Sequence, residues 1–170
     1  MLHHWRDEAP LTPDSHVPPR IDFANPANTA VLRFLGIADP EHARTTGPAQ
    51  VDWMTLGTHP DLVEYLWKLA APLPRACGCV INERSYPLLA HPGSGVIFGL
   101  AGGTSTLALR LPEPELEAAR AVPGFGHEYR YPSSTVNAAD MGDDWALVRP
   151  FGASNLAWCA RAFVHAEGGG

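Results

Sequence analysis

The segment His91-Pro92-Gly93-Ser94-Gly95 combines a histidine, a serine and two glycines in one short loop. Histidine can act as a general base, serine as a nucleophile, and glycines let backbone amides approach a ligand. His91, Gly93, Ser94 and Gly95 are therefore candidate ligand-loop residues. A nucleophile elbow needs Gly-x-Ser-x-Gly between a strand and a helix, and a phosphate loop needs a following lysine. Neither pattern is present, so the segment is more typical of a tight turn that enters a strand.

An alternative hypothesis is that the protein is an enzyme. His91, Ser94 and His127, joined by Asp140, are the residues on which a small hydrolase or a metal-dependent enzyme would be built. Catalytic groups must converge on one cleft, so this hypothesis requires His91 and His127 to lie close together. No nucleophile–base motif supports it, and we therefore favour a protein that is not an enzyme.

Two groups of residues could hold a metal ion. Cys77 and Cys79 are two positions apart, which places both thiols on the same face of a strand. A structural zinc site needs four ligands, and only Cys159 and the histidines could complete this one. The acidic run 140–144 with His127 and Glu128, and with His91 or His165 as a further ligand, could bind a divalent ion. The resulting candidate ligands are Cys77, Cys79, His127 and Asp140.

Simpler structural roles explain both groups. Cysteine is often a buried core residue, so we favour reduced, buried thiols. Met141-Gly142-Asp143 is typical of a turn ahead of a strand at Trp145, and the run lacks the pattern of a calcium-binding loop. The sequence therefore predicts no metal and no other cofactor.

The charge and hydropathy of the chain favour some environments over others. Twelve basic residues against eighteen acidic ones give a net charge of −6, and the arginines are scattered, which argues against a nucleic-acid partner. Proline, glycine or a charge interrupts every apolar run before the roughly 18 residues of a membrane span. The first eight residues contain no apolar stretch, so we expect a cytoplasmic protein. Eleven arginines beside one lysine, with abundant Ala, Pro and Gly, indicate a bacterial source.

The pattern of the chain predicts one folded domain between two tails. Residues 1–20 form a Pro-rich extended arm containing Trp5, residues 21–167 form the domain, and 168–170 form a flexible tail. Caps followed by proline begin helices at Asn25-Pro26, Asp39-Pro40 and His59-Pro60. The predicted helices cover 26–35, 40–44, 61–71, 112–121 and 153–166, and the predicted strands cover 76–81, 86–90, 95–101, 104–111, 127–131 and 144–149.

This order of elements predicts an α+β fold. We expect an antiparallel sheet of five or six strands with helices mainly on one face, as in a two-layer sandwich. Gly102-Gly103 indicates a hairpin between two strands. In the second of these strands Leu107, Leu109 and Leu111 alternate with Thr106, Ala108 and Arg110, which predicts one buried and one wet face. In the last helix we expect Leu156, Ala160 and Phe163 to point inward.

A succession of segments over about residues 77–165 resembles a known family. The segments are Gly95-Val96-Ile97-Phe98-Gly99-Leu100, Leu107-Ala108-Leu109-Arg110, Pro112-Glu113-Pro114-Glu115, Pro123-Gly124, His127-Glu128-Tyr129 and Asp144-Trp145-Ala146-Leu147-Val148. Their order is similar to that in the small bacterial MmcQ/YjbR-like proteins. The resemblance implies an antiparallel sheet with helices, and a DNA-binding role.

That implied role meets one departure from the family pattern. The basic residue expected before the Trp145 strand is replaced by Asp143 and Asp144. DNA binding would also require the scattered arginines to gather on one surface. Those arginines are Arg84, Arg110, Arg130 and Arg149.

The sequence thus favours a non-catalytic cytoplasmic binding domain. Its partner is either a protein or a small molecule, and the arm with Trp5 is a candidate partner-facing segment. Association into a homodimer stays open.

Overall fold

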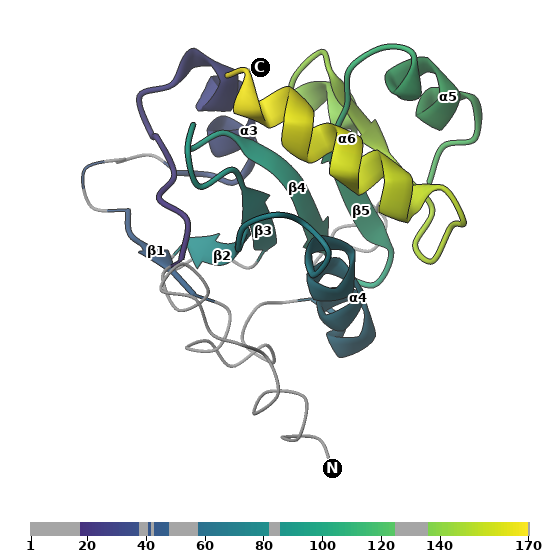
Figure 1. The fold of residues 1–170 in the computed structure, drawn as a ribbon, viewed down its shortest axis with the longest axis horizontal. Coiled ribbons are helices and arrows are strands. Elements are labelled where there is room, and N and C mark those ends of the chain that lie inside the picture. The colour runs from purple at the N-terminus through teal and green to yellow at the C-terminus, as the bar shows by residue number, and fades with distance from the viewer. Residues whose placement is uncertain are drawn as a thin grey trace.

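The computed structural model describes residues 18–37, 41, 43–47, 58–81, 86–124 and 136–169. Within them, six strands form one antiparallel sheet in which every strand lies beside its neighbours in sequence (Figure 1). The strands are β1 (Thr45–Thr46), β2 (Gly78–Ile81), β3 (Pro87–Ala90), β4 (Ile97–Gly102), β5 (Thr106–Arg110) and β6 (Trp145–Leu147). The predicted α+β class with an antiparallel sheet is confirmed.

Several predicted features fall outside the described residues. The arm lies there up to residue 17, as do the strand predicted at 127–131 and residues 40 and 42 of the helix predicted at 40–44. Of the other residues of that predicted helix, 41 is in 3-10 conformation, and 43 and 44 lie outside any helix. None of the described helices is both long and apolar enough to cross a bilayer.

The helices divide unequally between the two faces of the sheet. One face is covered by α4 (Pro60–Ala70), α5 (Glu115–Ala121) and α6 (Asn155–Glu167), whose buried side chains join a single core with β4 and β5. The other face receives α3 (Thr29–Phe34) and the short 3-10 helix η5 (Ala138–Asp140), whereas Ala27 of the 3-10 helix η1 (Pro26–Asn28) packs against the first core. The helices are therefore mainly on one face, as predicted.

The prediction that one face of β5 is wet is wrong. All five residues of the strand are buried, including the polar Thr106 and Arg110. On the second face Ala108 belongs to a core that also contains Val31 of α3 and Met141. The alternation of polar and apolar residues predicted that Thr106, Ala108 and Arg110 would be exposed to solvent. They are buried because the layer of short helices that contains α3 covers the second face of the sheet.

The inward face of α6 also differs from the prediction. Leu156 is 55% exposed, and Ala160 is exposed beside it. The side chains that face the sheet are Asn155, Cys159, Ala162, Phe163 and Ala166. The expected stripe is rotated by one residue, about 100° around the helix. Small residues at 159, 162 and 166 let α6 approach the strands closely, and this packing outweighs the burial of Leu156.

The predicted helix caps are confirmed where the structure describes them. The Asn25 side chain accepts a hydrogen bond from the Ala27 amide at 2.9 Å, and His59 Nδ1 accepts one from the Asp61 amide at 3.1 Å. A proline occupies the first helical position in both places. In α4 the leucines Leu62, Leu66 and Leu69 lie three or four positions apart and are buried on one side of the helix. The cap predicted at Asp39 lies outside the described residues.

A buried asparagine joins the N-terminal segment to the sheet. Asn28 Nδ2 donates to the carbonyls of Asp22 and Gly95 at 2.8 and 2.9 Å, and its Oδ1 accepts from the Ile97 amide at 2.9 Å. The Asp22 amide also donates to the Gly95 carbonyl at 3.0 Å. Gly95 has a φ of 73°, and a Cβ there would lie 2.5 Å from the Asp22 nitrogen. Only glycine permits this contact, because it combines a left-handed φ with the absence of a side chain.

We expect Asn28→Ala to lower the free energy of unfolding by about 3 kcal/mol, because it leaves buried backbone groups without partners. Urea denaturation followed by circular dichroism measures this change. The control is Asn25→Ala, which removes only a partly buried helix cap and should cost about 1 kcal/mol. Equal losses in the two variants would show that Asn28 does not have this special role.

Candidate functional site

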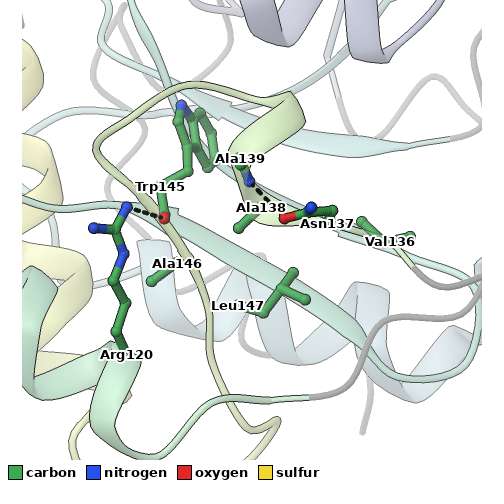
Figure 2. Close-up of a pocket in the computed structure, with 8 residues that line it drawn as sticks. All are labelled: Arg120, Val136, Asn137, Ala138, Ala139, Trp145, Ala146 and Leu147. Atoms are coloured by element: carbon green, nitrogen blue, oxygen red, sulfur yellow. Dashed lines mark hydrogen bonds between the residues drawn. The ribbon is translucent and has the colours of Figure 1, made fainter.

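A hollow of about 420 Å³ lies beside β6, at one edge of the sheet (Figure 2). η5 and the residues before it border β6 on one side, and Arg120 of α5 reaches over from the other side. Its volume falls within the range of small-molecule sites. We call this the β6 hollow, and its lining residues are Arg120, Val136, Asn137, Ala138, Ala139, Trp145, Ala146 and Leu147.

The register of β6 decides which of its backbone groups face outward. The Leu111 amide donates to the Asp144 carbonyl at 2.8 Å, and the Val148 amide donates to the Leu107 carbonyl at 2.9 Å. In an antiparallel pair this pattern turns the backbone groups of Ala146 towards β5. The amides and carbonyls of Trp145 and Leu147 therefore point away from the sheet.

Neighbouring segments already occupy the two outward carbonyls. Arg120 Nη2 donates to the Trp145 carbonyl at 3.2 Å and to the Asp143 carbonyl at 2.5 Å. The Gly124 amide donates to the Leu147 carbonyl at 3.1 Å. A Cβ at Gly124 would lie 2.2 Å from the Val148 oxygen, so a glycine is required for the chain to approach β6 this closely.

Asn137 holds the opposite wall of the hollow in shape. Its side-chain oxygen accepts a hydrogen bond from the Ala139 amide at 3.0 Å, which caps η5. Sequence reasoning singled out neither Asn137 nor Arg120. An asparagine two residues before an amide it can cap is a recognisable turn signal, but the meeting of this turn with α5 depends on the tertiary fold.

The predicted ligand loop forms the turn between β3 and β4. His91 is buried, and its Nδ1 accepts hydrogen bonds from the amides of Gly93 and Ser94 at 2.9 and 3.1 Å. Nδ1 therefore carries no proton, and the neutral ring is protonated at Nε2. The ring packs against Phe163 of α6 with centroids 4.6 Å apart. Burial lowers the pKa of His91, and the nearby Arg75 charge lowers it further while Glu167 opposes the shift.

The Ser94 hydroxyl has a structural partner on α6. Its Oγ donates to the Ala166 carbonyl at 2.7 Å and accepts from the Val96 amide at 3.2 Å. His91 and Ser94 are thus adjacent, but the imidazole bonds the backbone amide of Ser94 and not its hydroxyl. His127, the third residue of the catalytic hypothesis, lies outside the described residues.

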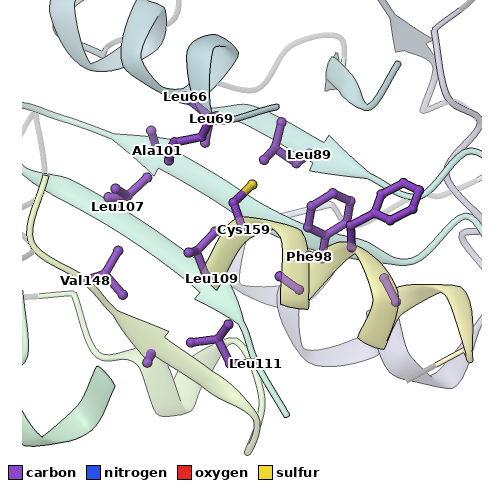
Figure 3. Close-up of a cluster of buried hydrophobic side chains, with 14 of the residues drawn as sticks. Leu66, Leu69, Leu89, Phe98, Ala101, Leu107, Leu109, Leu111, Val148 and Cys159 are labelled. Atoms are coloured by element: carbon purple, nitrogen blue, oxygen red, sulfur yellow. The ribbon is translucent and has the colours of Figure 1, made fainter. Parts of the chain in front are cut away.

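The three cysteines are free and buried, as the favoured interpretation predicted. Cys77 and Cys159 belong to the core under α6, where Cys159 lies among Phe98 and Leu109 (Figure 3), whereas Cys79 belongs to the core under α3. The prediction that Cys77 and Cys79 share one face is therefore wrong. The strand begins only at Gly78, so the alternation of side chains does not extend to Cys77.

Burial also makes these thiols poor nucleophiles. Desolvation raises the pKa of Cys77 and of Cys159 to about 12, and that of Cys79 further still. Asp140 is exposed on η5. Within the residues that the structure describes, no group of three or more His, Cys, Asp or Glu side chains is arranged to hold a metal ion.

An ion network that the sequence did not reveal joins β5, β6 and α6. Asp144 Oδ2 lies 2.8 Å from Arg110 Nε and 2.9 Å from His165 Nε2. Arg110 is only 5% exposed, so Asp144 compensates a buried positive charge. The network also bears on the DNA hypothesis, because a buried guanidinium is not available at the surface. Arg84 and Arg130 lie outside the described residues.

Comparison of the chain with protein-family models, with curated proteins and with solved structures finds no match. The likeness to MmcQ/YjbR-like proteins therefore rests on the residue pattern alone.

The lowered pKa of His91 predicts a pH dependence of stability. In the unfolded chain the imidazole takes up a proton as the pH falls below about 6.5, whereas the folded protein resists protonation until a lower pH. His91 should therefore make the protein less stable as the pH falls from 7 to 5. We expect His91→Asn to reduce this loss, measured by urea denaturation at both pH values. The control His59→Asn alters an exposed cap and should keep the wild-type slope, and identical slopes in all three proteins would contradict the prediction.

The buried thiols give a second prediction. Native protein at pH 8 should react with Ellman's reagent at none of its three cysteines during minutes, because burial covers the thiols and raises their pKa values far above 8. In guanidinium chloride all three should react. A rapid native reaction at any of them would show that one thiol is accessible and activated.

Proposed function

We propose that the protein is a non-catalytic binding protein whose small-molecule ligand occupies the β6 hollow. The observation that carries this proposal is the composition of the lining, whose side chains are apolar apart from the Arg120 guanidinium, the Asn137 carboxamide and the indole N–H of Trp145. Ligand sites typically combine such apolar walls with a few polar groups that fix orientation. The eight lining residues include no carboxylate, imidazole, hydroxyl or thiol, so a bound molecule would be held and not transformed.

The charge of Arg120 suggests the chemistry of the ligand. One of its guanidinium nitrogens is engaged with two backbone carbonyls, which fixes the side chain over the hollow. The other N–H groups make no hydrogen bond to the residues that the structure describes, and a carboxylate is their best acceptor. The predicted ligand is a compact apolar molecule with one carboxylate end.

The edge position of the hollow favours a small molecule over an extended peptide. A peptide that adds a strand to a sheet needs both donors and acceptors along the edge. At β6 the outward carbonyls of Trp145 and Leu147 are already bonded to Arg120 and Gly124. A peptide would have to displace these contacts before it could pair.

Straight-chain carboxylates of four to eight carbons test the proposal, with the alcohols of the same length as controls. We expect the acids to shift the amide resonances of Asn137, Ala139 and Leu147 in a nitrogen-15 NMR titration. Arg120→Gln should weaken binding about tenfold or more, because it removes a charge-assisted hydrogen bond. The alcohols should bind weakly in both proteins.

Two further variants separate binding from folding. Ala139→Trp places a large ring in the hollow from the exposed η5 and should abolish the shifts, whereas Ala118→Trp, on an exposed position of α5 that does not line the hollow, should not. Thermal melting checks that each variant is folded. If no acid of the series shifts these resonances, or if acids and alcohols bind alike, the proposed ligand class is wrong.

A further inference from the structure

The outward side of α6 carries an apolar strip. Leu156 is 55% exposed and Val164 is 52% exposed, with the exposed Ala160 midway between them. Residues four apart lie in a row along a helix, so these three side chains form one line. Phe151 precedes the helix, and its ring, which packs on Tyr65 of α4 with centroids 4.5 Å apart, is still 65% exposed. We call Phe151, Leu156, Ala160 and Val164 the α6 strip.

The strip is unusual for the molecule that carries it. Among the described residues only four large hydrophobic side chains are exposed, and three of them belong to the strip. α6 packs its other side on β4 and β5, and in Figure 1 it lies in front of the sheet with no described segment covering it. Contiguous exposed apolar surface commonly marks an interaction site.

We propose that the α6 strip is the contact between two copies of this chain, with their α6 helices packed antiparallel about a two-fold axis at Ala160. The strip is symmetric about this residue, with one large side chain four positions before it and one four positions after it. Antiparallel packing places Leu156 of each copy against Val164 of the other. The two Ala160 residues meet at the axis, where their small side chains let the helices come close. A two-fold interface requires this kind of self-complementary pattern, and an unlike partner does not.

The ends of the helix are complementary in charge. Glu167 is exposed in the last turn of α6, and antiparallel packing brings it to the first turn of the other copy's helix. That end carries the positive pole of the helix dipole. Ser154 occupies the cap position there but forms no cap hydrogen bond with its side chain to the described residues. A carboxylate from the second copy would supply the missing acceptor.

The ends are also complementary in shape. Phe151 lies before the start of α6 with one side of its ring against Tyr65 of α4, and Gly168 and Gly169 follow the end of the helix. In the antiparallel arrangement each phenyl ring meets the two glycines of the other copy, which present no side chain. Arg161 lies beside the strip in an ion pair with Glu115 at 3.3 Å, and forms part of a polar rim.

Sedimentation equilibrium of the full chain between 1 and 200 µM tests the proposal. We expect the wild type to show a monomer–dimer equilibrium in this range. Ala160→Glu puts two carboxylates together at the axis, and Leu156→Glu puts a charge in the contact, so each should raise the dimer dissociation constant at least tenfold. Both positions are exposed, and circular dichroism should show unchanged folding. Ala118→Glu, at an exposed position on α5 outside the strip, is the matched control and should leave the dimer unchanged.

A cross-linking variant tests the geometry directly. Ala160→Cys should form an intermolecular disulfide under mild oxidation, because the axis brings the two residues close together, whereas Ala118→Cys should not. A wild type that stays monomeric at 200 µM would overturn the proposal. So would a dimer that survives both glutamate substitutions, since its contact would then lie elsewhere on the chain.

Discussion

The turn between β3 and β4 ties both helical layers to the sheet, and the rest of the fold depends on it. On one side Asn28 bonds the backbone at Gly95 and Ile97 and so fixes the N-terminal segment. On the other side the Ser94 hydroxyl bonds the last turn of α6 through the Ala166 carbonyl. His91 holds the turn itself in shape by accepting two of its amides. Asn28, and His91 and Ser94 of the turn itself, thus satisfy backbone groups in and around one partly buried turn, where an unpaired buried group would be costly.

This constraint explains why the residues that looked most reactive are structural. A histidine and a serine beside glycines are what a catalytic loop needs, but they are equally what a partly buried turn needs to satisfy its amides. The catalytic role and the structural role differ only in which groups lie next to the imidazole nitrogens and the hydroxyl. In this chain the Ser94 hydroxyl faces a helix carbonyl and His91 Nδ1 faces backbone N–H groups. Residue type alone could not distinguish these cases.

Local signals predicted much of the fold. Apolar runs located β2 to β6, and Asn25-Pro26 and His59-Pro60 marked helix starts that the structure confirms. Errors arose where tertiary packing decides. The closeness of α6 to the sheet selected small residues over Leu156, and the cover provided by α3 removed the expected wet face of β5. The β6 hollow could not be predicted from the sequence, because residues of α5, η5 and β6 line it together. Whether these elements meet depends on which strand lies at the edge of the sheet.

The two edges of the sheet have a consequence for how the protein meets others. β1 has only two residues, and the outer carbonyls of β6 are bonded to Arg120 and Gly124. Short or obstructed edge strands hinder the edge-to-edge pairing of sheets from different molecules, which is the step that builds fibres. Within the residues that the structure describes, neither edge therefore presents a long free row of backbone groups for pairing with another sheet. Contacts with other molecules therefore depend on surfaces formed by side chains. Such surfaces can be changed by single substitutions that leave the pairing of the strands intact.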